Sequence, residues 1–145
     1  MKKLLLFLFF GLLAISAKSQ NMLNLNESTL ISKMIEYGAY NSGKKYTKEG
    51  IPFLTFQYSI DHAKVDGIIG SYYYLNEDGI CDVSIIRYND SKYLDTWVEF
   101  FKSTSNFRKV SGKFAWDNDK GGFQVQVEVN DVDHFSLIWM KYSHK

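Results

Sequence analysis

Cysteine is almost missing from this chain: Cys81 is the only one, so no disulfide can form within one molecule. Cys81 lies between apolar neighbours in an expected strand, where a free thiol behaves as a small apolar side chain. We expect a buried structural cysteine; a disulfide between two molecules and a catalytic nucleophile are the alternatives. No histidine is near Cys81 in the sequence and no nucleophile-elbow glycine pattern is present, so nothing supports nucleophilic catalysis.

An excess of charge is also missing, since the chain has 17 Lys and Arg against 16 Asp and Glu. No basic stripe follows the chain, so a nucleic-acid partner is not expected. No glycine-rich loop leads into a helix as phosphate binding requires. The sequence therefore predicts no catalytic residue, no cofactor and no nucleic acid.

Long apolar runs are limited to the N-terminus. Two lysines precede an apolar run from Leu4 to Ile15, and small residues follow it. This pattern is typical of a signal peptide, and the run is shorter than the roughly 20 residues of a membrane span. We expect residues 1–19 to be cleaved and residues 20–145 to form a single secreted or periplasmic domain without a membrane span. A retained signal anchor is the alternative.

Proline occurs once, and Pro52 is expected to begin a strand, a position that tolerates its missing N–H. Before it, Asn26 is a good N-cap for a helix that ends at Gly38. The polar stretch 39–50 is expected to be a loop. The strand after Pro52 has alternating apolar residues that we expect in the core: Leu54, Phe56 and Tyr58.

The stretch 71–89, SYYYLNEDGICDVSIIRYN, predicts a β-hairpin, because the dipeptide Asp78-Gly79 supplies the glycine that a tight turn needs. A two-residue loop pairs Tyr74 with Val83, and a four-residue loop pairs Tyr74 with Cys81. Either even-length loop puts the same residues on the expected core face: Tyr72, Tyr74, Cys81, Val83 and Ile85. The other face then carries Tyr73, Leu75, Asp82 and Ser84, and an odd-length loop would reverse the two faces.

A second helix is expected over 91–105, followed by three strands over 110–116, 123–129 and 135–142. The helix has a broad apolar stripe at helical spacing: Tyr93, Leu94, Trp97, Val98, Phe100 and Phe101. A six-residue loop between the first two strands pairs Trp116 with Phe123 and Phe114 with Val125. The last two strands then share an inward apolar set: Phe123, Val125, Val127, Phe135, Leu137 and Trp139.

This order, α-β-β-β-α-β-β-β, consists of two similar halves. Both halves contain an aromatic strand, an acidic turn with glycine and a second alternating strand. An internal duplication is compatible with this pattern, although the sequence identity is too slight to establish it. We expect an α+β fold in which two helices pack on one face of an antiparallel sheet.

One stretch resembles a calcium loop. Asp117, Asp119, Gly122 and Glu128 match the first, third, sixth and twelfth positions of an EF-hand loop, while Gly121 stands at the fifth, where Asp or Asn is usual. An EF-hand loop leads into a helix, whereas residues 123–129 alternate as a strand does. We therefore expect a hairpin turn and no metal site, with a weak calcium site as the alternative.

Two acid–histidine neighbours, Asp61-His62 and Asp133-His134, lie beside expected turns. Brought together, they could hold a metal or act as acid and base. Nothing in their spacing requires that they meet, so surface turns are the expectation. They support the alternative function, an exported hydrolase-type enzyme whose site is assembled from distant Asp and His residues.

The leading hypothesis is a small exported protein that binds another protein, a peptide or a small ligand without chemistry of its own; a homodimer is a further option. By alternation, several residues of the last strands should point away from the helices, together with Tyr73 if the two halves form one sheet. Exposed apolar groups among amides mark interaction sites. The candidate binding residues are Tyr73, Gln124, Gln126, Glu128, Ile138 and Met140.

Overall fold

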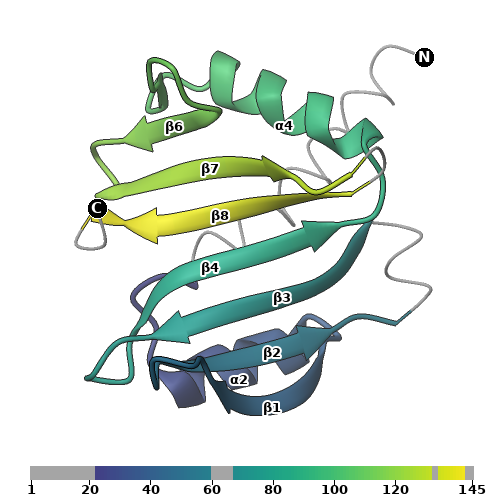
Figure 1. The fold of residues 1–145 in the computed structure, drawn as a ribbon, viewed down its shortest axis with the longest axis vertical. Coiled ribbons are helices and arrows are strands. Elements are labelled where there is room, and N and C mark those ends of the chain that lie inside the picture. The colour runs from purple at the N-terminus through teal and green to yellow at the C-terminus, as the bar shows by residue number, and fades with distance from the viewer. Residues whose placement is uncertain (1–21, 60–66, 132–133, 143–145) are drawn as a thin grey trace.

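Two helices and eight strands form the part of the chain that this computed structural model describes, residues 22–59, 67–131 and 134–142 (Figure 1). The expected signal peptide lies outside the described residues. In chain order the elements are α2 (Glu27–Glu36), β1 (Tyr40–Tyr46), β2 (Pro52–Gln57), β3 (Ile68–Leu75), β4 (Cys81–Tyr88), α4 (Lys92–Ser103), β5 (Arg108–Lys109), β6 (Ala115–Asn118), β7 (Phe123–Val129) and β8 (Phe135–Lys141). Within these ranges, no helix has the length and apolar character that crossing a membrane requires.

All eight strands belong to one antiparallel sheet in the order β1-β2-β3-β4-β8-β7-β6-β5. The predicted α+β class, with helices on an antiparallel sheet, is confirmed. Each half nevertheless has one strand more than predicted. The stretch expected to be a loop contains β1, which pairs with β2 from Tyr40 to Tyr46, and the short β5 precedes β6. Pairing with a neighbour thus outweighs the weak strand propensity of these polar residues.

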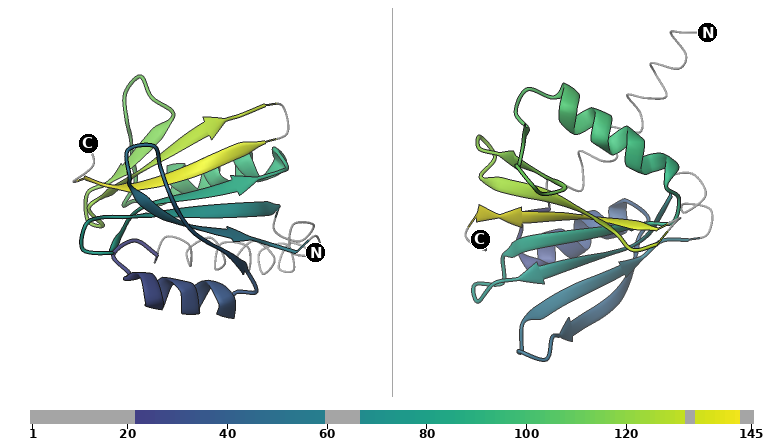
Figure 2. Two further views of the ribbon diagram at one scale, coloured as in Figure 1. Left: turned by 60° about the horizontal axis from the view of Figure 1, so that its bottom comes forward. Right: turned by 45° about the horizontal axis from the view of Figure 1, so that its top comes forward.

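Both helices cover the same face of the sheet. One row of directly paired residues crosses all eight strands: Lys44, Leu54, Tyr73, Ser84, Trp139, Val125, Trp116 and Lys109. Tyr73 Oη lies 3.2 Å from Met34 Sδ of α2, and the Trp139 ring lies edge-on to Trp97 of α4, 6.0 Å between centroids. Figure 2 shows α2, α4 and the twisted sheet from two further sides. The core therefore fills the space between the two helices and this face.

Both ends of helix α2 have the capping residues that the sequence predicts. The Asn26 side chain accepts a hydrogen bond from the Thr29 N–H at 2.9 Å, so it is the N-cap. At the other end Gly38 has φ of 79° and donates its N–H to Ile35 O, while Ala39 N–H bonds to Met34 O. These two bonds form a Schellman motif, which explains why the helix ends at this glycine.

The central hairpin has the predicted pairing but the opposite faces. Tyr74 pairs with Val83, as a two-residue loop requires. A β-bulge then places Leu75 opposite Cys81, so Asp82 is the extra residue. The bulge shifts Cys81 to the helix side, and Tyr73 is fully buried there. The prediction was therefore wrong for the aromatic and aliphatic residues that face away from the helices: Tyr72, Tyr74, Val83 and Ile85.

The last strands keep the predicted faces with one shift of register. Trp116 pairs with Val125 rather than with Phe123, because the loop has four residues, 119–122, instead of six. The strand predicted over 110–116 is divided: its first part is a turn, and only Ala115 and Trp116 belong to β6. A shift by two residues preserves the alternation. The predicted inward set of β7 and β8 is accordingly buried: Phe123, Val125, Val127, Phe135, Leu137 and Trp139.

Candidate binding face

The face of the sheet turned away from α2 and α4, here called the open face, is the candidate site. Side chains alternate along a strand, so the neighbours of the residues in the row from Lys44 to Lys109 point to the open face. The pairing of the strands arranges them in rows. One row holds Phe53, Tyr74, Val83, Met140 and Gln124, and the next holds Thr55, Tyr72, Ile85, Ile138 and Gln126. A third row contains Gly70, Arg87, Ser136 and Glu128.

The middle of the open face is apolar. Seven of its apolar side chains, on β2, β3, β4 and β8, are half-buried rather than enclosed: Phe53, Tyr72, Tyr74, Val83, Ile85, Ile138 and Met140. The Phe53 and Tyr74 rings stack with centroids 5.2 Å apart. Burial, with a smaller contribution from Tyr72, raises the pKa of Tyr74. A continuous apolar surface of this kind is rare on a face that meets only water.

An apolar depression of about 330 Å³ lies in this surface. Its lining comes from the loop before β2 and from three neighbouring strands, and includes Ile51, Tyr74, Val83, Ile85, Ile138 and Met140. The buried carboxylate of Asp82 lies at its margin and forms an ion pair with Lys141 Nζ at 3.0 Å. The volume is at the lower end of the range of roughly 300–1,000 Å³ for small-molecule sites.

A second depression on the open face, of about 160 Å³, is polar and cationic. Lys45 and Arg87 both line it, together with Thr55 and Tyr72. Arg87 Nη1 donates a hydrogen bond to the Tyr72 hydroxyl at 3.4 Å. Gly70, which pairs with Arg87, also lines it. This part of the face was not expected from the sequence, because Arg87 could be placed only once the register of β4 was known.

The six residues predicted for binding have different positions. Ile138 and Met140 lie on the open face and line the apolar depression, while Gln126 and Glu128 are exposed beside them. Gln124 also lies on this face but is only 6% exposed. Tyr73 faces the helices and is fully buried, so its expected outward position was wrong. The structure thus brings four of the six together on an accessible surface.

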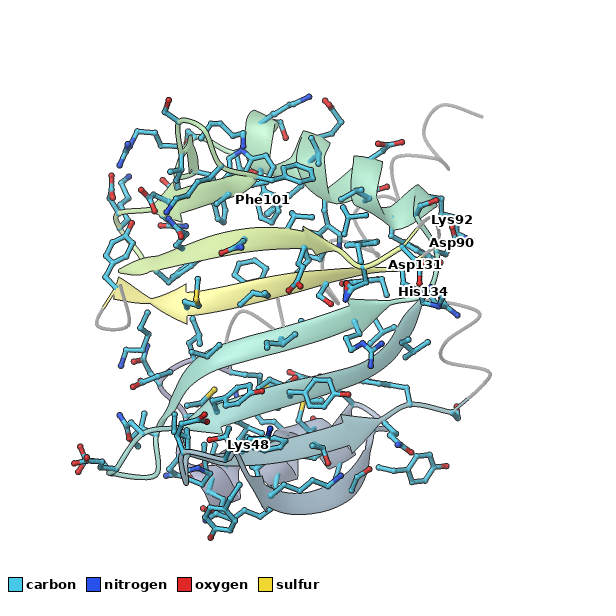
Figure 3. All side chains as sticks on the ribbon, viewed as in Figure 1. Lys48, Asp90, Lys92, Phe101, Asp131 and His134 are labelled. Atoms are coloured by element: carbon cyan, nitrogen blue, oxygen red, sulfur yellow. The ribbon has the colours of Figure 1, made fainter. Side chains whose placement is uncertain are left out.

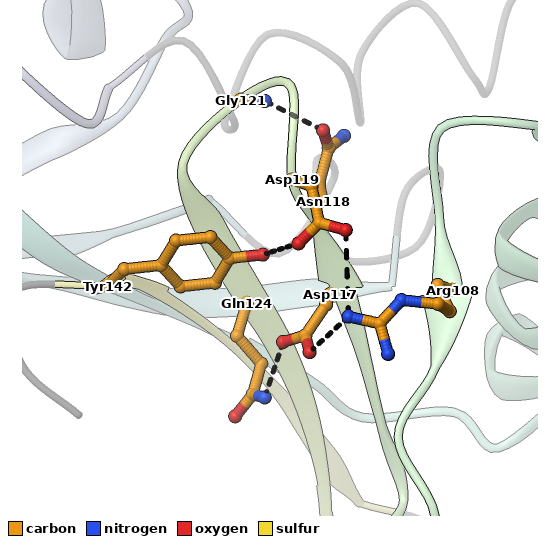
Figure 4. A network of polar contacts seen from close by, with 7 residues as sticks. All are labelled: Arg108, Asp117, Asn118, Asp119, Gly121, Gln124 and Tyr142. Carbon is orange, nitrogen blue, oxygen red and sulfur yellow. Dashed lines mark hydrogen bonds and ion pairs between the residues drawn. The ribbon is translucent and has the colours of Figure 1, made fainter.

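The calcium-like stretch is the β6–β7 hairpin with a polar network at its base (Figure 4). Asp117 accepts hydrogen bonds from Gln124 Nε2 at 2.7 Å and from Arg108 Nη2 at 3.3 Å. Asp119 accepts one from the Tyr142 hydroxyl at 2.9 Å. Burial of Tyr142, with the hydrogen bond to Asp119, raises the pKa of Tyr142 to about 12. Both carboxylates are therefore hydrogen-bonded in this network, and the predicted hairpin turn is confirmed.

The acid–histidine pairs are only partly described, since Asp61, His62 and Asp133 lie outside the described residues. His134 Nδ1 lies 2.7 Å from Asp131 Oδ1, at the end of the sheet where β7 leads into β8 (Figure 3). The His134 side chain is 41% exposed and that of Asp131 58%. In the ranges that the structure describes, no three His, Cys, Asp or Glu side chains are grouped to hold a metal ion.

Cys81 is fully buried at the start of β4, as predicted for a structural cysteine. Burial raises the pKa of its thiol to about 12, and the charge of Asp82 adds to the effect. The backbone N–H of Cys81 bonds to Leu25 O at 2.8 Å, and Asn24 N–H bonds to Cys81 O at 2.8 Å. These contacts attach the segment before α2 to the sheet, and a thiol in this position is unsuited to nucleophilic chemistry.

Comparison with family models, with curated proteins and with solved structures finds no match for this chain.

Proposed function

We propose that this chain is a small exported binding protein that uses the open face to bind a protein, a peptide or a small ligand. The observation that carries the proposal is the continuous apolar surface on β3, β4 and β8, with its depression of about 330 Å³. Adjacent exposed apolar groups on a folded surface commonly mark an interaction site. Ile138 and Met140 lie where this surface meets the amides of Gln126 and Gln124, and we expect them to contribute to binding.

The edges of the sheet are poorer binding surfaces than the open face. β1, at one edge, has a bulge between Asn41 and Gly43 and carries Lys44 and Lys45. β5, at the other edge, has only two residues. Bulges, lysines and short strands are the features that prevent pairing of an edge with another chain. Binding by addition of a strand is therefore disfavoured, which supports binding on the face.

Photo-crosslinking in the cells that produce the chain tests this proposal. A photoreactive residue at position 138 should give adducts, because the open face is the contact surface. The matched control is position 129, an apolar strand residue that is 55% exposed on the helix side of the sheet. The double change Ile138→Ser and Met140→Ser should remove capture of the same partner by the purified protein. Equal labelling from positions 138 and 129 would contradict the proposal.

A further inference from the structure

The two depressions of the open face adjoin along β3 and β4. Tyr72 and Arg87 line the polar depression, while Tyr74 and Ile85, two residues away on the same strands, line the apolar one. Side chains two residues apart on a strand point to the same face at about 7 Å from each other. The open face therefore offers a cationic end followed directly by an apolar lining.

The charges of this face favour an anion at the cationic end. Within the described ranges neither Lys45 nor Arg87 has an ion pair with a carboxylate. Arg87 uses one of its N–H groups for Tyr72, and a guanidinium has five. Among the described residues of the two linings, the one acid is Asp82, in the apolar depression, and its charge is compensated by Lys141.

We infer that the ligand of the open face is a small amphipathic carboxylate, a single apolar chain that ends in one carboxylate group. The inference rests on the proposed function, because it names the ligand class for the same face. The carboxylate binds in the cationic depression between Lys45 and Arg87, with the Tyr72 hydroxyl beside it. The apolar chain follows β3 and β4 into the lining formed by Tyr74, Ile85, Ile138 and Met140.

The size of the face limits the ligand. From Arg87 to Val83 the lining extends over four residues of β4, roughly 13 Å at the usual rise per strand residue. A medium-length chain covers this distance in its extended form, and the two depressions, about 330 and 160 Å³, do not enclose a larger lipid. A planar carboxylate matches the fork of an arginine side chain, which binds it through two parallel hydrogen bonds.

Calorimetric titration with decanoate below its micelle concentration tests the inference, with decyltrimethylammonium as the amphiphile of opposite charge. Decanoate should bind at one site per chain and about tenfold or more tightly than the cation. The double change Lys45→Gln and Arg87→Gln should remove the preference for decanoate. The double change Ile138→Ser and Met140→Ser should lower the affinity for both amphiphiles. The control is Lys113→Gln, at an exposed lysine in the turn before β6, which should change neither the affinity for decanoate nor that for the cation. Thermal unfolding of each variant shows whether it is folded.

Several outcomes would overturn the inference. These are no saturable binding of decanoate, equal affinity for both amphiphiles, or decanoate affinity that survives loss of both basic residues. A dimer in sedimentation velocity that Ile138→Ser with Met140→Ser dissociates, or binding only to vesicles of anionic lipid, would overturn it as well. The proposed function fails by a different result, the absence of specific crosslinks from position 138. If the chain does not bind decanoate but crosslinks to a partner from position 138, the proposed function stands and the inferred ligand class is wrong.

Discussion

Ser84 places a hydroxyl group in the middle of the core, between Tyr73 and Trp139 in the row of paired residues. Its Oγ is fully buried, and no group of the described chain accepts or donates a hydrogen bond to it. Ser136 differs, because its buried hydroxyl donates a hydrogen bond to Asn130 Oδ1 at 3.2 Å. Of these two serines on neighbouring strands, Ser136 is hydrogen-bonded within the described chain and Ser84 is not.

The change Ser84→Ala should leave the free energy of unfolding unchanged or raise it by about 1 kcal/mol, because a buried polar group without a partner is destabilising. Ser136→Ala should lower it by about 1 kcal/mol, because the hydrogen bond is lost. Chemical denaturation of both variants measures the difference. Equal destabilisation by the two changes would show that the Ser84 hydroxyl has a partner in solution, such as a bound water molecule.

Helices α2 and α4 begin in different ways. Asn26 caps α2 with its side chain, whereas Ser91 at the start of α4 makes no such bond. Asn26→Ala should therefore lower the free energy of unfolding by about 1 kcal/mol, and Ser91→Ala should change it by less than about 0.5 kcal/mol. Urea denaturation of the two variants checks this. A larger loss from Ser91→Ala than from Asn26→Ala would contradict the assignment of the caps.

At the scale of elements, the sequence predicts what depends on local pattern. The cap of α2, the apolar stripe of α4 and the alternation of β7 and β8 are all local signals, and each element is present. β1 could not be predicted in this way, because its residues are polar and its pairing with β2 alone makes it a strand. The prediction of the hairpin faces was wrong for another reason. Asp82 is an extra residue between Cys81 and Val83, so these two side chains point to opposite faces of the sheet rather than to the same one.

The candidate site was predictable to the same extent. Ile138 and Met140 followed from the alternation of β8, while Tyr72, Tyr74, Val83 and Ile85 were assigned to the wrong face with the hairpin. Lys45 of β1 and Arg87 of β4 line the same depression only because the four strands β1 to β4 are paired in this order. A charged residue at the second position of β4, Asp82, was the one signal in the sequence that could have suggested a bulge.

At the scale of the whole molecule, the two faces of the sheet should respond differently to substitution. Leu137 and Ile138 are neighbours in β8, but Leu137 is fully buried under the helices and Ile138 lies on the open face. Leu137→Ala should cost about 2–5 kcal/mol because it leaves a cavity in the core. Ile138→Ser should cost about 1 kcal/mol or less. Thermal and chemical denaturation compare the two, and a loss of several kcal/mol at Ile138 would show that the open face is covered in solution.

The position of β8 has a consequence for how the molecule acquires its shape. β8 is made after the seven other described strands, yet it lies in the middle of the sheet between β4 and β7. Until β8 has been synthesised, β4 and β7 lack the strand with which each pairs in the folded sheet. Closure then requires contacts between distant parts of the sequence, which makes folding slow. The core between the helices and the sheet is therefore completed only when β8, the last described strand, has joined β4 to β7.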